Sequence, residues 1–112
     1  MITKDILQLL EEVLEYLESD LEEGMASIDY QPYKKMVDAY YRETRELSSK
    51  CSGVQGAFYD TLHRFLLGLV AALNCIEGGD EAAELGRAYA YADAASYLID
   101  TFEKVLPEGG CQ

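Results

Sequence analysis

The apolar run FLLGLVAALNCI, between Phe65 and Ile76, constrains the fold more strongly than any other stretch of the chain. Its twelve residues would extend about 18 Å as an α-helix, whereas a bilayer core measures roughly 30 Å, so the run is too short to span a membrane. From Val54 onward, apolar residues recur at steps of three and four, which is the pattern of a buried helical face. We therefore expect a central core helix of a soluble domain, ended by the glycine pair Gly78-Gly79.

The same periodicity, together with capping residues, divides the rest of the chain into helices. Thr3 is placed to cap the first helix and Gly24 to end it. Pro32 suits the first turn of the second helix, with Asp29 or Gln31 as its cap. The predicted helices span about residues 3–23, 31–49, 53–77 and 80–106.

Capping signals also precede the third and fourth helices. Ser52 and Gln55 have the spacing of a capping box, and Asp80 can cap the last helix, which Pro107 would end. Short connections between the four segments favour antiparallel neighbours. The chain has 112 residues, of which 49% are hydrophobic. It is therefore predicted to form one all-α domain over residues 1–112, an antiparallel bundle of about four helices.

Small residues recur at steps of four along the fourth helix and include Gly86 and Ala90. Gly68 lies in the predicted third helix and could pack against these small residues, because two surfaces of small residues let helix backbones approach closely. We therefore expect the third and fourth helices to meet there.

The three cysteines, Cys51, Cys75 and Cys111, are an odd number without paired spacing. This argues against a disulfide framework and for a reducing compartment. The N-terminal sequence MITKDILQLLEEV carries acids where a secretion signal would be basic and apolar, so no signal is expected. Together these features predict a cytoplasmic protein.

The chain carries a formal net charge of -12, from 21 acidic and 9 basic residues. Such a balance opposes direct binding to nucleic acid and to anionic membranes, and it favours basic protein partners. The alternative is that the acidity serves only solubility.

The first helix concentrates these acids in a row at steps of four, three and four. The row comprises Glu11, Glu15, Glu18 and Glu22. Glu12, Asp20 and Glu23 are expected to extend it. Like charges at these spacings repel by a few tenths of a kcal/mol per pair. The row is therefore either a solvated face or a docking ridge for a basic partner.

The same helix has a leucine seam with the three- and four-residue steps of a coiled coil. The seam comprises Leu7, Leu10, Leu14, Leu17 and Leu21. Neighbouring apolar residues make this face broader than one packing contact needs. It can therefore serve an intramolecular neighbour and a partner chain, and the latter would make the protein a homodimer.

The second helix combines tyrosines with five of the nine basic residues of the chain. Tyrosine and arginine are enriched at binding surfaces, so we take Tyr33, Tyr41 and Arg45 as candidate partner-binding residues. The alternative is the edge of a bundle, where the phenol rings pack and the hydroxyl groups stay in water.

Asp60 and His63 are the one pair with metal-ligand or acid–base spacing. Di-iron bundles need two such pairs and further inward-facing glutamates, which the sequence lacks, so no metal or other cofactor is expected. A surface ion pair between Asp60 and Arg64 is the simpler interpretation. No phosphate loop, nucleophile elbow or zinc-binding cysteine pair is present, so we do not expect an enzyme.

The sequence thus favours a non-catalytic acidic interaction module. In this hypothesis it is an inhibitor or regulator that docks an acidic face on a basic, nucleic-acid-binding partner such as a nuclease. Spaced carboxylates would stand in for phosphates, as in anti-CRISPR-type nucleic-acid mimics, which are a functional analogy. One alternative is a homodimeric structural or adaptor subunit using the leucine seam or the tyrosine surface. A minor alternative is a small metal-binding or enzymatic bundle using Asp60 and His63.

Overall fold

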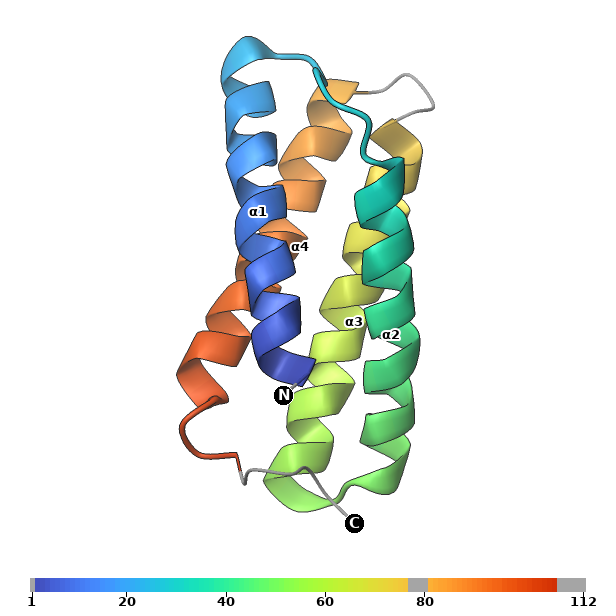
Figure 1. Ribbon diagram of the computed structural model, residues 1–112, viewed down its shortest axis with the longest axis vertical. Helices are drawn as coiled ribbons and strands as arrows, with labels where there is room; N and C mark the ends of the chain where they lie inside the picture. The colour runs from blue at the N-terminus through green and yellow to red at the C-terminus, as the bar shows by residue number, and fades with distance from the viewer. Residues whose placement is uncertain (1, 77–80, 107–112) are drawn as a thin grey trace.

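The computed structural model describes residues 2–76 and 81–106, and over these residues the chain is a bundle of four helices without strands (Figure 1). The helices are α1 (Ile2–Glu23), α2 (Gln31–Lys50), α3 (Gly53–Ile76) and α4 (Glu81–Phe102). Successive helices run in opposite directions, so the bundle is antiparallel. The predicted fold class is confirmed. The largest boundary difference is at α4, which ends at Phe102 and not at residue 106.

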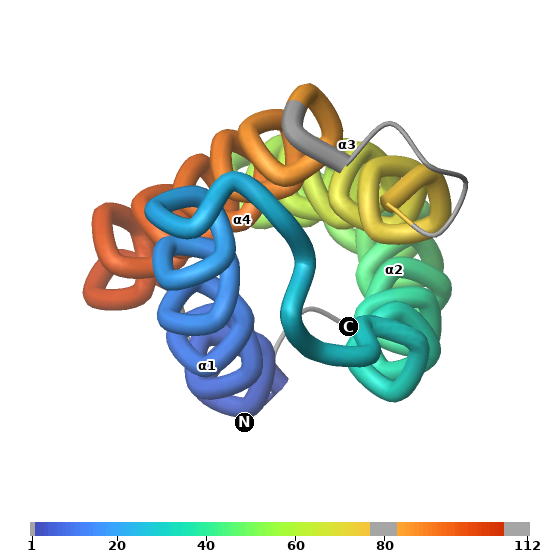
Figure 2. Tube along the Cα trace, turned by 90° about the horizontal axis from the view of Figure 1, so that it is seen from above, coloured from blue at the N-terminus to red at the C-terminus, as the bar shows by residue number. Residues whose placement is uncertain are grey.

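The core lies around α3, which packs along its length against both α2 and α4. Leu62, Leu66, Leu69 and Leu73 of α3 are at most 1% exposed. α1 packs on α4 and contacts α2 only sparsely. Seen end-on, α3 and α4 lie between two arms, α1 and α2, and the connection over residues 24–30 crosses the space between the arms (Figure 2).

Asp20 organises this connection. Gly24 takes a positive φ of 77° at the end of α1, as a glycine can. The backbone N–H groups of Gly24 and Met25 donate to the Asp20 carbonyl oxygen, at 2.8 and 3.2 Å. The Asp20 carboxylate accepts from Ser27 Oγ at 2.5 Å and from the Tyr30 hydroxyl at 2.6 Å. One residue therefore fixes both the end of α1 and the start of α2.

The predicted helix caps are only partly formed. Thr3 lies inside α1 and is buried, so it does not cap that helix. Pro32 does occupy the first turn of α2. Tyr30 takes the N-cap position there without a side-chain cap, and the Asp29 carboxylate accepts from the N–H of Gln31 at 3.0 Å. The predicted cap Asp80 and the predicted stop Pro107 lie outside the described residues.

The capping box expected before α3 is not formed. The helix begins at Gly53, whose φ is 64°. Gln55 turns its side chain inward, and its buried Nε2 has no hydrogen-bond partner. The start of α3 is therefore set by the glycine backbone and not by a reciprocal side-chain cap.

The contact between α3 and α4 differs from the expected pairing of two small surfaces. The ring of Tyr91 lies on Gly68, and a Cβ atom added at Gly68 would come within 2.4 Å of that ring. Gly86 and Ala90 are exposed, whereas Ala88 and Ala92 are buried. The glycine thus makes room for an aromatic side chain and not for a close backbone approach.

Cysteine usage also differs from the expectation. Cys51 is disulfide-bonded, so the expected absence of disulfides is wrong for this residue. Cys75 is an exposed free thiol, and Cys111 lies outside the described residues. The cysteines therefore no longer argue for a reducing compartment. In the described part of the chain, no helix combines the length and apolarity that a membrane crossing requires.

Candidate partner-binding surface

The acidic ridge, defined as Glu11, Glu15, Glu18 and Glu22, lies on the side of α1 that faces away from the core. All four side chains are exposed. None of them forms an ion pair with a basic residue in residues 2–76 and 81–106. The repulsion between neighbouring carboxylates is therefore not offset by a partner in this part of the chain.

Asp20 does not belong to this ridge, although its charge and its place near the end of α1 led us to expect it there. Asp20 is only 1% exposed. Burial raises the pKa of Asp20. Hydrogen bonds from the side chains of Ser27 and Tyr30 and from the Ser27 backbone together lower it by more, so the pKa falls below its ordinary 3.8. Burial and the Asp20 carboxylate together raise the pKa of Tyr30. The cluster is structural, and Glu12 and Glu23 are the exposed members of the predicted extension.

Charge is distributed unevenly between the two arms of the bundle. α1 carries eight acidic residues and one basic residue, whereas α2 carries five basic and three acidic residues. On α2, Lys34 and Lys35 line a depression shared with Leu67 and Asn74 of α3, and Lys34 Nζ donates to Asn74 Oδ1 at 3.1 Å. These two basic side chains thus lie toward α3. Their positive charge is therefore not on the side of α2 that faces α1.

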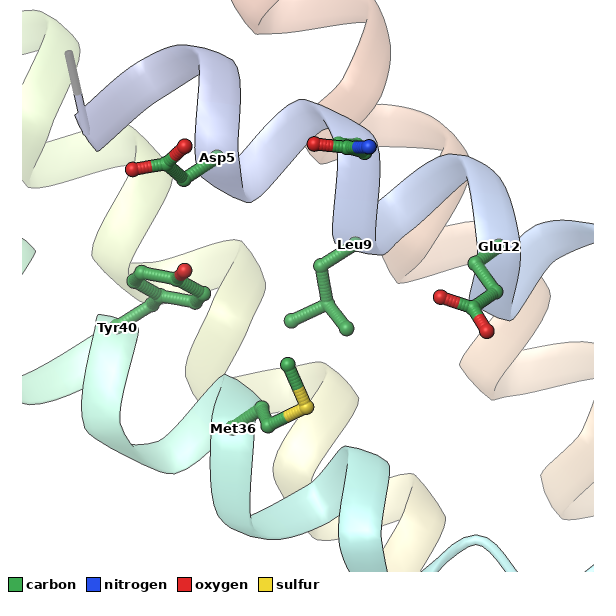
Figure 3. A pocket seen from close by; sticks show the side chains of 6 residues that line it. Asp5, Leu9, Glu12, Met36 and Tyr40 are labelled. Carbon is green, nitrogen blue, oxygen red and sulfur yellow. The ribbon is translucent and has the colours of Figure 1, made fainter.

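A groove lies between α1 and α2, where the two arms contact each other only sparsely. Its volume is about 210 Å³. The lining residues are Asp5, Gln8, Leu9, Glu12, Met36 and Tyr40. Figure 3 shows Leu9 pointing toward Met36, with Asp5 above Tyr40 and Glu12 at the other end of the α1 wall. The groove therefore has an apolar centre between two carboxylates.

The leucine seam is divided between the interior and the surface. Leu10 and Leu17 are fully buried in the core of the chain itself, so they cannot meet a partner while the bundle is folded. Leu7 and Leu14 are half-buried against the core, and Leu21 is 37% exposed. A partner can reach only the outer row, Leu7, Leu14 and Leu21.

The three candidate residues of α2 do not form one surface. The Tyr33 hydroxyl donates to Glu12 Oε1 at 3.0 Å, and the Tyr33 ring lies 5.7 Å from that of Tyr16. Burial raises the pKa of Tyr33, as do its hydrogen bonds with Tyr16 and Glu12. Tyr33 therefore faces α1. Tyr41 is half-buried on the α3 side, and Arg45 is exposed.

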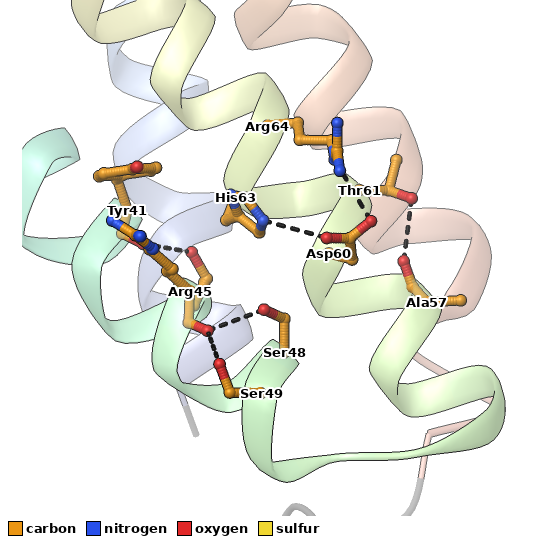
Figure 4. Close-up of polar contacts among 10 residues, drawn as sticks. Tyr41, Arg45, Ser48, Ser49, Ala57, Asp60, Thr61, His63 and Arg64 are labelled. Carbon is orange, nitrogen blue, oxygen red and sulfur yellow. Dashed lines mark hydrogen bonds and ion pairs between the residues drawn. The ribbon is translucent and has the colours of Figure 1, made fainter.

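The Asp60–His63 pair is part of an ion-pair cluster on α3. His63 Nε2 lies 3.1 Å from Asp60 Oδ1, and Arg64 Nε donates to Asp60 Oδ2 at 3.3 Å (Figure 4). The Tyr41 ring packs 5.8 Å from the imidazole, whose buried Nδ1 has no hydrogen-bond partner. No three metal-ligating side chains gather in the described residues. Asp60 thus makes the i,i+3 and i,i+4 contacts of a salt bridge on a helix surface.

Comparison of the chain with protein-family models, with curated proteins and with solved structures gave no significant match. The feature that sequence reasoning missed is the groove. The signal for it was present on α1, where Asp5, Leu9 and Glu12 share one face at steps of four and three.

Proposed function

We propose that the chain is a non-catalytic interaction module that docks the acidic side of α1 on a basic protein partner. The observation that carries this proposal is the acidic ridge, which is exposed and has no ion-pair partner within the described residues. A free row of like charges is mildly destabilising, and a basic partner would remove that repulsion on binding.

The spacing of the ridge suits a partner that normally binds nucleic acid. From Glu11 to Glu22 the helix rises about 16 Å, so four carboxylates follow one another at roughly 5–6 Å. A nucleic-acid strand carries one charge per roughly 3.4 Å, which is the same order of density. In this proposal the chain inhibits or regulates an enzyme such as a nuclease by occupying its basic channel, as anti-CRISPR-type mimics do.

The test is affinity capture from a lysate of the source cells at low and at high salt, followed by binding measurements on the protein recovered. We expect a basic nucleic-acid-binding protein that is released by salt and that competes with nucleic acid. The double substitution Glu11→Lys and Glu15→Lys should weaken binding at least tenfold.

The matched control is Asp93→Lys with Asp100→Lys, which changes the net charge equally on exposed positions of α4. It should weaken binding much less than the ridge variant. Equal effects of the two variants would show that only net charge matters. Retention that does not change with salt would contradict the proposal.

A second proposal is a homodimer, supported by the outer leucine row of α1. Leu7, Leu14 and Leu21 repeat every seven residues and remain partly exposed. A stable dimer needs about 800 Å² on each partner, so this row would have to recruit neighbouring surface. Light scattering tests the proposal. A monomer at high concentration, or a dimer unaffected by Leu21→Lys, would overturn it.

A further inference from the structure

Among the described residues, the side of the bundle between α1 and α2 is sparsely packed. In the part of the chain that the structure describes, α3 packs against two helices and α1 packs fully only against α4. The side of α1 that faces α2 is filled near the connection, where Tyr33 meets Glu12 and Tyr16. Further along, Leu9 and Met36 face each other across the groove (Figure 3). Met36 remains 47% exposed there.

The α1 wall of the groove has a defined order of chemical groups. Asp5, Leu9 and Glu12 lie on one face, and the two acids are two helical turns apart, about 10 Å along the axis. An apolar side chain therefore lies between two negative charges. The opposite wall adds Met36 and Tyr40, one turn apart on α2.

We propose that this groove binds an amphipathic helix of the basic partner. Two Lys or Arg side chains seven residues apart on that helix would pair with Asp5 and Glu12. An apolar side chain between them would pack mainly on Met36, which is 47% exposed, beside Leu9, which is only 5% exposed. A helix provides this pattern because residues at i, i+3 or i+4 and i+7 share one face. The inference rests on the proposed function and names the segment of the partner that is recognised.

The size and the charge of the groove both favour this occupant. A volume of about 210 Å³ corresponds to roughly seven liquid waters. This is room for one large apolar side chain of a helix that rests across the groove. The local charge is negative because Asp5 and Glu12 line it, while Lys34 and Lys35 of α2 lie in the depression shared with α3. In this arrangement the acidic ridge attracts the partner at long range, and the groove holds its helix.

The probe for the test is a synthetic helical peptide with two lysines seven positions apart and two leucines between them. Its matched control has the same composition, with one lysine moved to the opposite face of the helix. We expect the patterned peptide to bind the full chain at least tenfold more tightly than the control peptide, as measured by fluorescence anisotropy. Methionine-methyl NMR should show the Met36 resonance shift while that of Met25, in the connection, stays in place.

The protein variants separate the groove from the ridge. Asp5→Asn with Glu12→Gln should weaken binding of the patterned peptide about tenfold. Gln at position 12 keeps an oxygen that can accept from the Tyr33 hydroxyl, so the contact between the arms is retained. Glu11→Gln with Glu15→Gln removes the same charge from the ridge and should weaken peptide binding less than threefold.

Equal binding of the two peptides, or binding unaffected by the groove variant, would overturn the inference. If the captured cellular partner still depends on Glu11 and Glu15 in that case, the proposed function stands without the groove. If the partner depends on neither set of acids, the proposed function itself fails.

Discussion

The α3 side of the bundle and the side between α1 and α2 are held together by different forces. α3 meets its neighbours through a continuous row of buried leucines. α1 and α2 are joined at one end by polar contacts from Asp20 and Glu12 to tyrosine hydroxyl groups. Further along, the groove lies between the two arms. Apolar packing thus holds α3 to its neighbours, while hydrogen bonds link α1 to Tyr30 and to the start of α2.

The composition of α2 explains the difference. Only Val37 and Thr44 are buried on this helix, and the Thr44 hydroxyl donates back to the Tyr40 and Tyr41 carbonyl oxygens. The helix thus has enough apolar surface for α3 and little left for α1. Tyr33 supplies part of the missing contact through its hydroxyl group. A bundle built in this way can expose a groove without losing its core.

The largest expected change in stability comes from the row of buried leucines on α3. Leu66→Ala should lower the free energy of unfolding by about 2–5 kcal/mol, because it leaves a cavity at a position that is 1% exposed. Leu67→Ala, at the neighbouring position that is 47% exposed, is the control. Chemical denaturation followed by circular dichroism measures both. Equal losses at the two positions would contradict the assignment of α3 as the centre of the core.

The next largest expected change in stability comes from the hydrogen bonds of Asp20, between α1 and the connection to α2. Asp20→Ala should cost about 1–3 kcal/mol, because it leaves the buried Tyr30 hydroxyl without an acceptor. Tyr30→Phe removes one of the same hydrogen bonds and should cost less. Glu18→Ala, on the exposed ridge, should leave the unfolding free energy within about 0.5 kcal/mol. A loss at Glu18 as large as that at Asp20 would show that the polar end does not anchor the arms.

Acid pH probes the same cluster. The pKa of Asp20 is lower in the folded chain than its ordinary 3.8. The stability that its ionised form contributes is therefore full above pH 3.8 and is lost as the pH falls through the lowered folded value. The difference in unfolding free energy between the wild type and Asp20→Asn should shrink below that pH. A constant difference from neutral to acid pH would contradict an ionised Asp20.

Helical periodicity predicts the fold from the sequence. The same periodicity indicates that Asp20 faces inward. Asp20 lies seven residues after Val13 and three after Leu17, so it belongs to the buried stripe of α1. Its charge suggested the surface, because a buried carboxylate needs hydrogen-bond donors. One of those donors, Tyr30, lies beyond the end of the helix, where periodicity gives no information.

The distance between α1 and α2 at the groove and the Gly68 contact could not be predicted, for a different reason. Periodicity indicates which side of a helix faces inward, and Met36 and Tyr40 lie on the side of α2 that faces α1. The distance to the facing helix depends on the combined size of side chains from two or three helices. Likewise, the residue of α4 that packs on Gly68 is Tyr91 and not one of the smaller residues of that helix.

The smallest expected change in stability belongs to the groove itself. Met36→Gln replaces an exposed apolar side chain with a polar one of similar length, so the unfolding free energy should change by less than about 0.5 kcal/mol. Binding of the patterned basic peptide should nevertheless weaken severalfold, because the apolar contact at the centre of the groove is lost. The two quantities are measured on the same sample by denaturation and by anisotropy. A loss of stability comparable to that of Asp20→Ala would show that Met36 packs as core and that the arms are closed in solution.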